Sequence, residues 1–328
     1  MKLSVSDLQK IVHNAVSCSF DENGGVTLCR FTQSQMDTVT RLSADWLKKA
    51  KSSAAMTLDF ITDSDILVLK FDLFPGSSRQ TASLDLYVDG VFHASKQMAG
   101  LDAKMAGFQL PAGQHRVTVY LPWSVQLVIR EVHLSDGASI REVEKSCKLL
   151  CLGDSITQGY DAAFTSLTYV NQIARELNAE VIDQGIGGHI FHVEYIDESV
   201  RQIDPDLITV AYGTNDYGQY ETLEEYAAHT GAYLRKLAQL FPNTKILGIL
   251  PIYRNDGNYQ ARKLYRPYSM DDARQVLRAQ YAEIGAHVVE ETGIAHLPQM
   301  YAPDFLHPND LGFSLMAKGI LKKIKEII

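Results

Sequence analysis

Two segments of the chain carry a serine and a histidine of the kind that nucleophilic catalysis needs. Ser155 lies in the segment Gly153–Thr157, directly after a short apolar run, and His307 lies three residues after Asp304 and directly before Pro308. Histidine suits a general base because its unperturbed pKa is about 6.5. In a tight turn, a spacing of three lets the carboxylate reach Nδ1 and leaves Nε2 free to face the serine.

Each of these residues also has a purely structural explanation. Gly-Asp-Ser is common turn chemistry, and serine or aspartate caps helices well. Asp304 and Asn309 could cap the last helix, which would leave His307 as a surface residue. The position of Ser155 favours a nucleophile, because its turn follows the first strand of the second half of the chain. The histidine segment does not decide the question alone.

Two further segments could supply the donors that stabilise an oxyanion. The run Gly185–Gly188 contains three glycines, and glycine lets a backbone N–H approach a ligand closely. A dinucleotide-binding fingerprint is not indicated, because its sixth position holds Ile190. In the segment Gly213–Asp216, the amide of Asn215 could donate to an oxyanion. A plain turn and an Asx-turn are the respective alternatives.

The histidines that follow the glycine run raise the question of a metal. His189 and His192, with Glu194 nearby, are spaced like half a metal site. No second cluster supplies the remaining ligands, and Phe191 between the histidines favours packing. The chain has no G-x-x-x-x-G-K-[ST] phosphate loop and no G-x-S-x-G nucleophile elbow. We therefore expect neither a metal nor a cofactor.

The second half of the chain alternates apolar runs with amphipathic segments. Continuous apolar runs predict strands of a parallel sheet that is covered on both faces, and the alternation predicts a doubly wound α/β domain. Ligands of such domains bind at the carboxyl ends of the strands, where all four segments fall. The expected strands are 148–153, 180–185, 206–213 and 245–252, and the expected helices are 168–178, 222–240, 271–285 and 309–326.

The first half has the pattern of an antiparallel β-sandwich of the jelly-roll type. Its short strands are evenly spaced, and Asp89-Gly90 favours a tight hairpin turn. One helix is expected over residues 36–50. With 328 residues, the chain should form two domains, which we place at 1–146 and 147–328. The expected strands are 55–61, 66–73, 84–88, 91–92, 116–121 and 125–129.

Composition excludes several classes of partner. The net charge of −8 argues against nucleic acids and anionic membrane surfaces. No stretch approaches the ~20 apolar residues of a membrane span, and the N-terminus lacks the apolar region of a signal peptide. The four cysteines have no C-x-x-C spacing, so reduced thiols and a cytoplasmic location are expected, although Cys18 and Cys29 could pair across a hairpin. A homo-oligomer is compatible with these properties.

Taken together and in this order, the four segments resemble the four blocks of the SGNH (GDSL) hydrolases over about residues 147–328. The resemblance implies a flavodoxin-like three-layer α/β/α fold. It also implies a catalytic triad in which Ser155 is the nucleophile, His307 is the base and Asp304 orients the base. Asp183 departs from the asparagine that often begins the second block.

The same resemblance implies an oxyanion hole. Its donors would be the backbone N–H groups of Ser155 and Gly188 and the side chain of Asn215. Gly188 is preferred among the three glycines because the family's donor is the last of such a run, and Gly187 is the second choice. This assignment places the donors after three different strands of the expected sheet.

The β-rich first half resembles, in architecture, the two-domain SGNH enzymes that include carbohydrate esterase family 2 and related acyl esterases and acyltransferases. This implies a carboxylic ester hydrolase that acts on small acyl esters, above all acetyl groups on carbohydrates. The alternatives are an acyltransferase with the same triad and a carbohydrate-binding protein with an idle hydrolase domain. The substrate would be a small-molecule or oligosaccharide ester.

Three residues are candidates for contacting such a substrate. Asp154 precedes the serine, and Trp123 could stack on a sugar ring or fill the domain interface. Tyr253 begins a segment rich in tyrosine and arginine, 253–268, which is long for a connection after a strand and should overhang the site.

Overall fold

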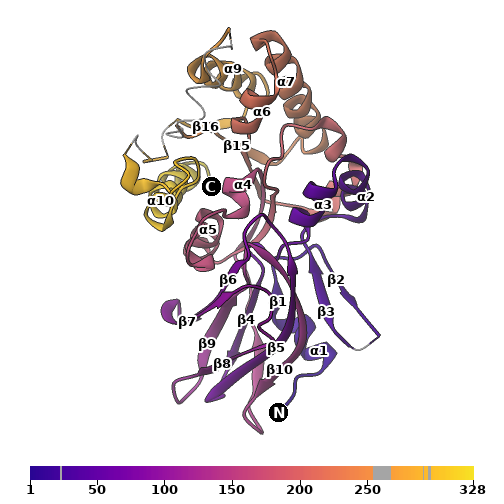
Figure 1. Cartoon of the computed structure of the whole chain (residues 1–328), viewed down its shortest axis with the longest axis vertical. Coiled ribbons are helices and arrows are strands. Elements are labelled where there is room, and N and C mark those ends of the chain that lie inside the picture. Colours follow the sequence, from indigo (N-terminus) through magenta and orange to yellow (C-terminus); the bar gives the residue numbers. More distant parts are fainter. Residues whose placement is uncertain (23, 254–266, 291, 295–296) are drawn as a thin grey trace.

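The computed structural model describes residues 1–22, 24–253, 267–290, 292–294 and 297–328. Two regions are evident in Figure 1, where antiparallel strands form the lower part and a parallel sheet with its helices forms the upper part. Most of the segment rich in tyrosine and arginine lies outside the described residues, so its position over the site stays a prediction.

The lower region is a β-sandwich of two antiparallel sheets, preceded by the short helix α1 (Val5–Ile11). Apolar side chains from the two inner faces form a common core. In one sheet β1 (Val12–His13), β4 (Thr57–Thr62), β9 (His115–Tyr120), β6 (Thr81–Val88) and β7 (Val91–Ala99) are neighbours in that order, and β11 (Ile140–Glu142) pairs with β4. The other sheet has the order β2 (Ser17–Phe20), β3 (Val26–Cys29), β10 (Val125–Leu134), β5 (Ile66–Pro75) and β8 (Met105–Gln109).

The turn between β6 and β7 explains one hairpin of this sandwich. Asp89 and Gly90 both have positive φ, 49° and 79°. Two such residues in succession give a hairpin turn whose twist matches that of the flanking strands. The two antiparallel sheets and their common core confirm the expected sandwich, while its jelly-roll connectivity stays a prediction.

The upper region is built on one parallel sheet with the strand order of a flavodoxin-like fold. The strands, in spatial order, are β13 (Ala179–Gly185), β12 (Cys147–Gly153), β14 (Leu207–Ala211), β15 (Lys245–Ile249) and β16 (His287–Val289). The three-layer α/β/α prediction is confirmed. Sequence analysis missed β16, because three residues are too short for a recognisable apolar run.

Helices cover both faces of this sheet. Leu149 and Cys151 of β12 pack on the side of α5 (Tyr169–Leu177) and α10 (Asp310–Ile327), and Leu150 and Leu152 pack on the opposite side. That opposite side carries α7 (Leu223–Leu240) and α9 (Met270–Glu283). Shorter helices among the described residues of this region are α4 (Ser155–Gln158), α6 (Thr214–Gln219), η1 (Thr165–Leu167), η2 (Val193–Tyr195), η3 (Glu198–Ile203) and η4 (Pro298–Met300).

The prediction of one helix over residues 36–50 is wrong, because two helices occupy this region. Ser43 is extended (φ −160°) between α2 (Gln33–Leu42) and α3 (Ala44–Ala50), and its side chain accepts a hydrogen bond from the backbone of Trp46. Val39 and Ala50 belong to the same core as the parallel sheet, and Figure 1 shows both helices beside the upper region. The division of the chain at residues 146 and 147 stays a prediction.

Two other expectations concern the whole chain. All four cysteines are free thiols, and Cys18 lies opposite Leu28 rather than Cys29 in the β2–β3 hairpin. Among the described helices, none is both long and apolar enough to cross a bilayer.

Candidate active site

Three of the four segments converge because three neighbouring strands end at the same edge of the sheet. Gly153 of β12 pairs with Gly185 of β13 and with Ala211 of β14, so the turns after these strands lie side by side. At Gly185 an added Cβ would lie 2.2 Å from the backbone nitrogen of Gln158. Only glycine therefore lets the second turn pack against the helix that begins at Ser155.

Ser155 is the first residue of α4. The side chain of Asp154 caps this helix by accepting a hydrogen bond from the N–H of Ile156 at 3.0 Å. The first N–H groups of a helix have no partner within the helix, so the N–H of Ser155 points out of its end. The local sequence thus presents a hydroxyl and a backbone donor together.

His307 is held by a turn that the carboxylate of Asp304 closes. Asp304 Oδ1 accepts the backbone N–H groups of Leu306 and His307, both at 3.0 Å. Asp304 Oδ2 lies 2.6 Å from His307 Nδ1, and His307 Nε2 lies 2.7 Å from Ser155 Oγ. The structure therefore brings together the three residues that the sequence predicted, in the order carboxylate, imidazole and hydroxyl.

The electrostatic surroundings favour a charged imidazole. Burial lowers the pKa of His307, but the carboxylates of Asp161 and Asp304 outweigh burial and leave it above its usual 6.5. Burial raises the pKa of Asp304, yet hydrogen bonds from His307 and the backbone hold that pKa well below its usual range. A proton that arrives on the imidazole is thus stabilised without protonating the carboxylate.

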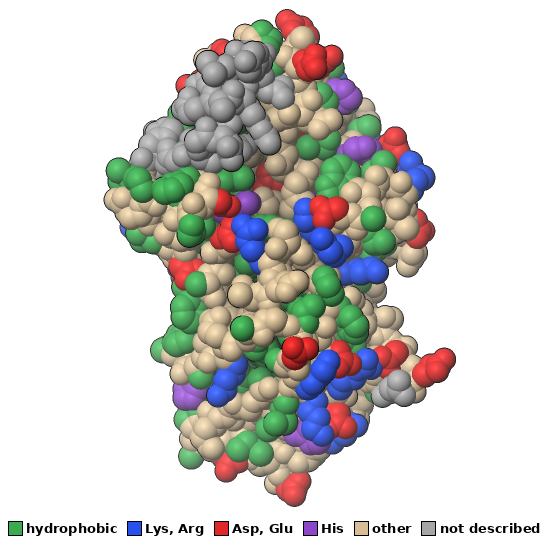
Figure 2. Space-filling model, in the orientation of Figure 1, with side chains coloured by type: hydrophobic (Ala, Val, Ile, Leu, Met, Phe, Trp, Pro, Cys, Tyr) green, Lys and Arg blue, Asp and Glu red, His purple; other side chains and the backbone are tan. Residues whose placement is uncertain are grey.

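Asp161 is a second carboxylate at this imidazole, and sequence analysis missed it. Its Oδ2 lies 3.2 Å from His307 Nδ1. Arg79, from the connection between β5 and β6, donates to both oxygens of Asp161 at 2.7 and 2.8 Å. The ring of Tyr160 stacks on His307, with centroids 5.3 Å apart. Figure 2 shows basic, acidic and histidine side chains gathered where the two regions meet.

One N–H group of the glycine run has no acceptor among the described residues. The N–H of Gly187 donates to Gln158 Oε1 at 2.8 Å, so it is already used. Gly188 has a φ of +81°, which favours glycine, and within the described parts of the chain its N–H has no acceptor. Asn215 donates one amide hydrogen to the backbone oxygen of His189 at 3.0 Å, and its other amide hydrogen has no acceptor among the described residues. This geometry favours Gly188 over Gly187 as a donor.

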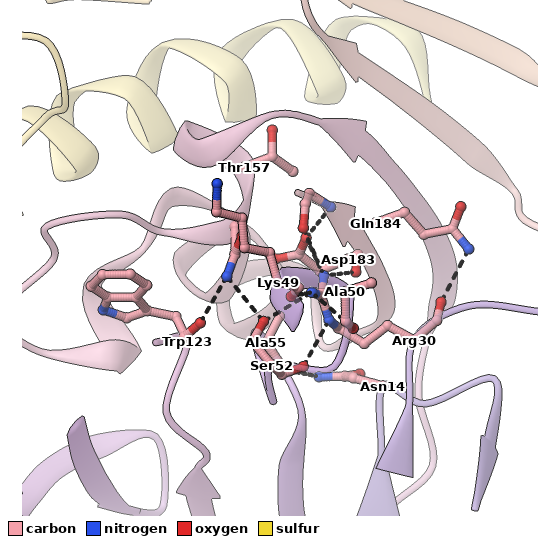
Figure 3. A network of polar contacts seen from close by, with 12 residues as sticks. Asn14, Arg30, Lys49, Ala50, Ser52, Ala55, Trp123, Thr157, Asp183 and Gln184 are labelled. Atoms are coloured by element: carbon pink, nitrogen blue, oxygen red, sulfur yellow. Dashed lines mark hydrogen bonds and ion pairs between the residues drawn. The ribbon is translucent and has the colours of Figure 1, made fainter. Parts of the chain in front are cut away.

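Arg30 holds the glycine run from the side of the first half of the chain. This arginine is 0% exposed and donates to the backbone oxygens of Asp183 and Gly185, the latter at 3.1 Å. It also reaches the carboxylate of Asp183 at 3.3 Å and the backbone oxygen of Ser52 at 3.0 Å. Figure 3 shows this network around Arg30 and Asp183. The arginine thus ties β13 to the segment after α3.

Two more side chains fix the same loop, and neither was singled out from the sequence. Lys49 of α3 donates to the backbone oxygen of Gly187 at 2.9 Å. Gln158 is 0% exposed, and its amide nitrogen lies within 3.0 to 3.2 Å of Gly76 O, Ser52 Oγ and Trp123 O. The loop after β13 is therefore held by residues on both sides of it.

The three candidate substrate contacts have different outcomes. Asp154 is buried and occupied as a helix cap, and Trp123 is buried with its indole N–H donated to Ala162 O at 3.0 Å. Contact with substrate does not fit either side chain, because both are enclosed by protein. Tyr253 stays a prediction: it lines a hollow of about 640 Å³ that includes neither Ser155 nor His307 in its lining.

The histidine pair after the glycine run is in an aromatic environment. His189 is buried between the rings of Trp46 and Tyr195, at centroid distances of 4.7 and 4.5 Å, and burial lowers its pKa to about 3. His192 lies beside the same tryptophan at 6.2 Å. This surrounding fits the packing interpretation of the two histidines.

Comparisons with known proteins agree with this geometry. The model of the GDSL-like lipase/acylhydrolase family matches residues 151–315. A comparison with the curated proteins finds no match to the sequence. Among solved structures, a salicylyl-acyltransferase from a tetracycline biosynthetic pathway has a TM-score of 0.82 at 19% identity, covering 100% of this chain and 97% of that one.

Two carbohydrate esterases of family 2 are also similar in structure. The enzyme from Cellvibrio japonicus has a TM-score of 0.64 at 17% identity and covers 100% of this chain and 97% of its own. The enzyme from Clostridium thermocellum, solved with cellohexaose, has a TM-score of 0.66 at 13% identity, and the match covers 96% of this chain and 98% of that one. Both likenesses extend over the sandwich as well as the parallel sheet. With the family match over half of its length, the chain belongs to the GDSL-like lipase/acylhydrolase family and is an ester hydrolase.

Proposed function

We propose that this enzyme hydrolyses small acyl esters, with acetyl groups on carbohydrates as the first choice, through Ser155, His307 and Asp304. The observation that carries the proposal is the chain of contacts from Asp304 Oδ2 to His307 Nδ1 at 2.6 Å and from His307 Nε2 to Ser155 Oγ at 2.7 Å. A serine activated by an oriented imidazole is the arrangement that acyl transfer needs.

The proposed reaction proceeds through an acyl-enzyme. His307 Nε2 takes the proton of Ser155 as the oxygen attacks the ester carbonyl, and the carbonyl oxygen becomes negative. The N–H groups of Ser155 and Gly188 and the second amide hydrogen of Asn215 would donate to that oxygen. His307 then gives its proton to the leaving alkoxide. A water molecule, activated in the same way, releases the acid.

The choice of a carbohydrate ester is supported by the structural neighbours that are named as carbohydrate esterases. These neighbours share the sandwich in front of the parallel sheet, which the family match alone does not cover. The acetyl preference follows from the same analogy. The four free thiols support the predicted cytoplasmic location, since disulfides are rare in that compartment.

An acyltransferase is the second candidate. It is favoured by the neighbour with the TM-score of 0.82, which is named as a salicylyl-acyltransferase and matches both regions of this chain. The triad would be unchanged, and an alcohol would replace water in the second step. Product analysis in the presence of sugar acceptors separates the two, because only a transferase yields a new ester.

The test is a hydrolysis screen over acetylated sugars and p-nitrophenyl esters of graded chain length. We expect turnover of acetyl esters by the wild type and a loss of about 10⁶ in kcat in Ser155→Ala. A fluorophosphonate should label the wild type at Ser155 and leave the variant unlabelled. Near-normal turnover in Ser155→Ala, or a wild type that is neither active nor labelled, would contradict the proposal.

A further inference from the structure

His307 Nδ1 has one hydrogen to donate but faces two carboxylate oxygens. Asp304 Oδ2 lies at 2.6 Å and Asp161 Oδ2 lies at 3.2 Å. Asp304 also receives two backbone N–H groups, which shape its own turn. Among the described residues, Asp161 accepts no backbone N–H group of the histidine turn. Shaping that turn is therefore not the reason why Asp161 lies beside the imidazole.

Two carboxylates this close would repel each other unless a cation balanced them. Arg79 supplies that cation through a two-point contact with Asp161, and its Nη2 lies 3.6 Å from Asp304 Oδ2. The pair Arg79–Asp161 adds no net charge to the triad. It does place a negative oxygen, rather than the guanidinium, against His307 Nδ1.

The backbone that carries Asp161 is shaped for this position. Asp161 has a φ of 67°, in the left-handed region that aspartate tolerates better than most residues. The preceding Tyr160 stacks under the imidazole, and its hydroxyl accepts the backbone N–H of Ser78 at 3.3 Å. Arg79 follows Ser78, so one turn of the sandwich holds both the aromatic ring and the second carboxylate.

We propose that Asp161, held by Arg79, is a second positioning carboxylate for His307, through which the N-terminal sandwich takes part in catalysis. This inference rests on the proposed function of Ser155 and His307. When the imidazole becomes positive during attack, both carboxylates stabilise it, and Arg79 keeps the site from carrying an excess negative charge at rest. Arg79 and Asp161 carry opposite charges, so they shift the pKa of His307 in opposite directions.

The opposite signs give a sharp test. Neutralising Asp161 in Asp161→Asn removes a negative neighbour and leaves Arg79 unbalanced, so the pKa of His307 should fall by about one unit or more. Arg79→Gln leaves two carboxylates without their cation, so the same pKa should rise. Because activity needs the neutral imidazole, the acidic limb of kcat/KM should move to lower pH in Asp161→Asn and to higher pH in Arg79→Gln.

The pKa is measured in two ways. The pH profile of kcat/KM uses an acetyl ester, and NMR titration of ¹⁵N-labelled histidine uses no substrate, with His307 assigned from His307→Gln. Arg130→Gln is the matched control, because Arg130 pairs with Asp72 at 2.6 Å within the sandwich and should leave the pKa of His307 unchanged. The NMR result stands even if no ester is hydrolysed, so failure of this inference is distinguishable from failure of the proposed function.

A second pair of variants addresses redundancy. Asp304→Asn retains an oxygen for the turn, and Asp161 can then take the Nδ1 hydrogen, so kcat should fall by less than the ~10⁴ seen when a lone triad carboxylate is lost. The double variant Asp304→Asn with Asp161→Asn should show the full loss. The inference would be overturned if the pKa of His307 did not move in Asp161→Asn and Arg79→Gln, or moved in the same direction in both. Equal activity of Asp304→Asn and the double variant would also overturn it.

Discussion

The two sides of Ser155 are held in different ways. On the base side, Arg79 is 37% exposed and binds carboxylates that face the imidazole. On the oxyanion side, Arg30 is 0% exposed and donates to backbone oxygens of the strand that precedes the glycine run. Both arginines come from the first half of the chain. One acts on the charge of the base, and the other acts on the position of a backbone.

This difference shows which property each side requires. A general base must have a suitable pKa, which neighbouring charges adjust even from a partly exposed site. An oxyanion hole must have donors at fixed positions, since its contribution depends on geometry that needs no rearrangement during the reaction. Substitutions on the two sides should therefore differ in what they change as well as in how much.

The largest contrast concerns stability. Arg30→Gln removes the partner of several buried oxygens and of Asp183, so we expect the free energy of unfolding to fall by about 3–5 kcal/mol. Arg79→Gln breaks a partly exposed ion pair, which should cost no more than about 1 kcal/mol. Urea unfolding followed by circular dichroism measures both. Equal costs would show that the two arginines do not differ as their exposure implies.

The next contrast concerns turnover. Asn215→Ala should lower kcat by about 10² to 10³, because one donor to the oxyanion is lost, while the acidic limb of the pH profile stays in place. Gln219→Ala is the control, since Gln219 is exposed on the same helix α6. Steady-state kinetics with an acetyl ester from pH 5 to 9 gives both quantities. A shifted limb with unchanged kcat would assign Asn215 to the base side instead.

The smallest effect is expected from the lysine that holds the glycine run. Lys49→Met removes one hydrogen bond to Gly187 O and should lower kcat about tenfold, again without moving the pH profile. Lys48→Met is a close control, because Lys48 and Lys49 both pair with Asp45 but, of these two lysines, Lys49 is the one that donates to Gly187 O. If both variants lose the same activity, the common pair with Asp45 is responsible.

The sequence predicted those parts of the molecule that depend on local patterns. The strands at 148–153 and 180–185 and the helices at 222–240 and 309–326 lie within two residues of their expected bounds. Burial on both faces leaves a continuous apolar run in these strands, and burial on one face leaves a periodic pattern in these helices. Three of the four segments meet at one edge because parallel strands align their carboxyl ends. The break at Ser43 also had a local signal, since serine is a good helix cap.

The second carboxylate and the two arginines had no such signal. Arg79 and Asp161 are 82 residues apart, and Arg30 and Asp183 are 153 apart, so nothing in a sequence window joins them. Asp161 reads as an ordinary turn residue, and its partner lies in a turn of the sandwich. Contacts of this kind depend on how the two regions pack, which periodicity and turn chemistry do not encode.

The buried amide of Gln158 has a consequence for how this enzyme can be divided or recombined. Its oxygen accepts a hydrogen bond from the N–H of Gly187. Its nitrogen faces Ser52 Oγ, Gly76 O and Trp123 O, which all come from the first half of the chain. A fragment beginning at the first parallel strand would keep every residue of the triad but would lack those acceptors. Exchanging the sandwich for an unrelated module would leave the same deficit, so we expect the catalytic half to need its own sandwich.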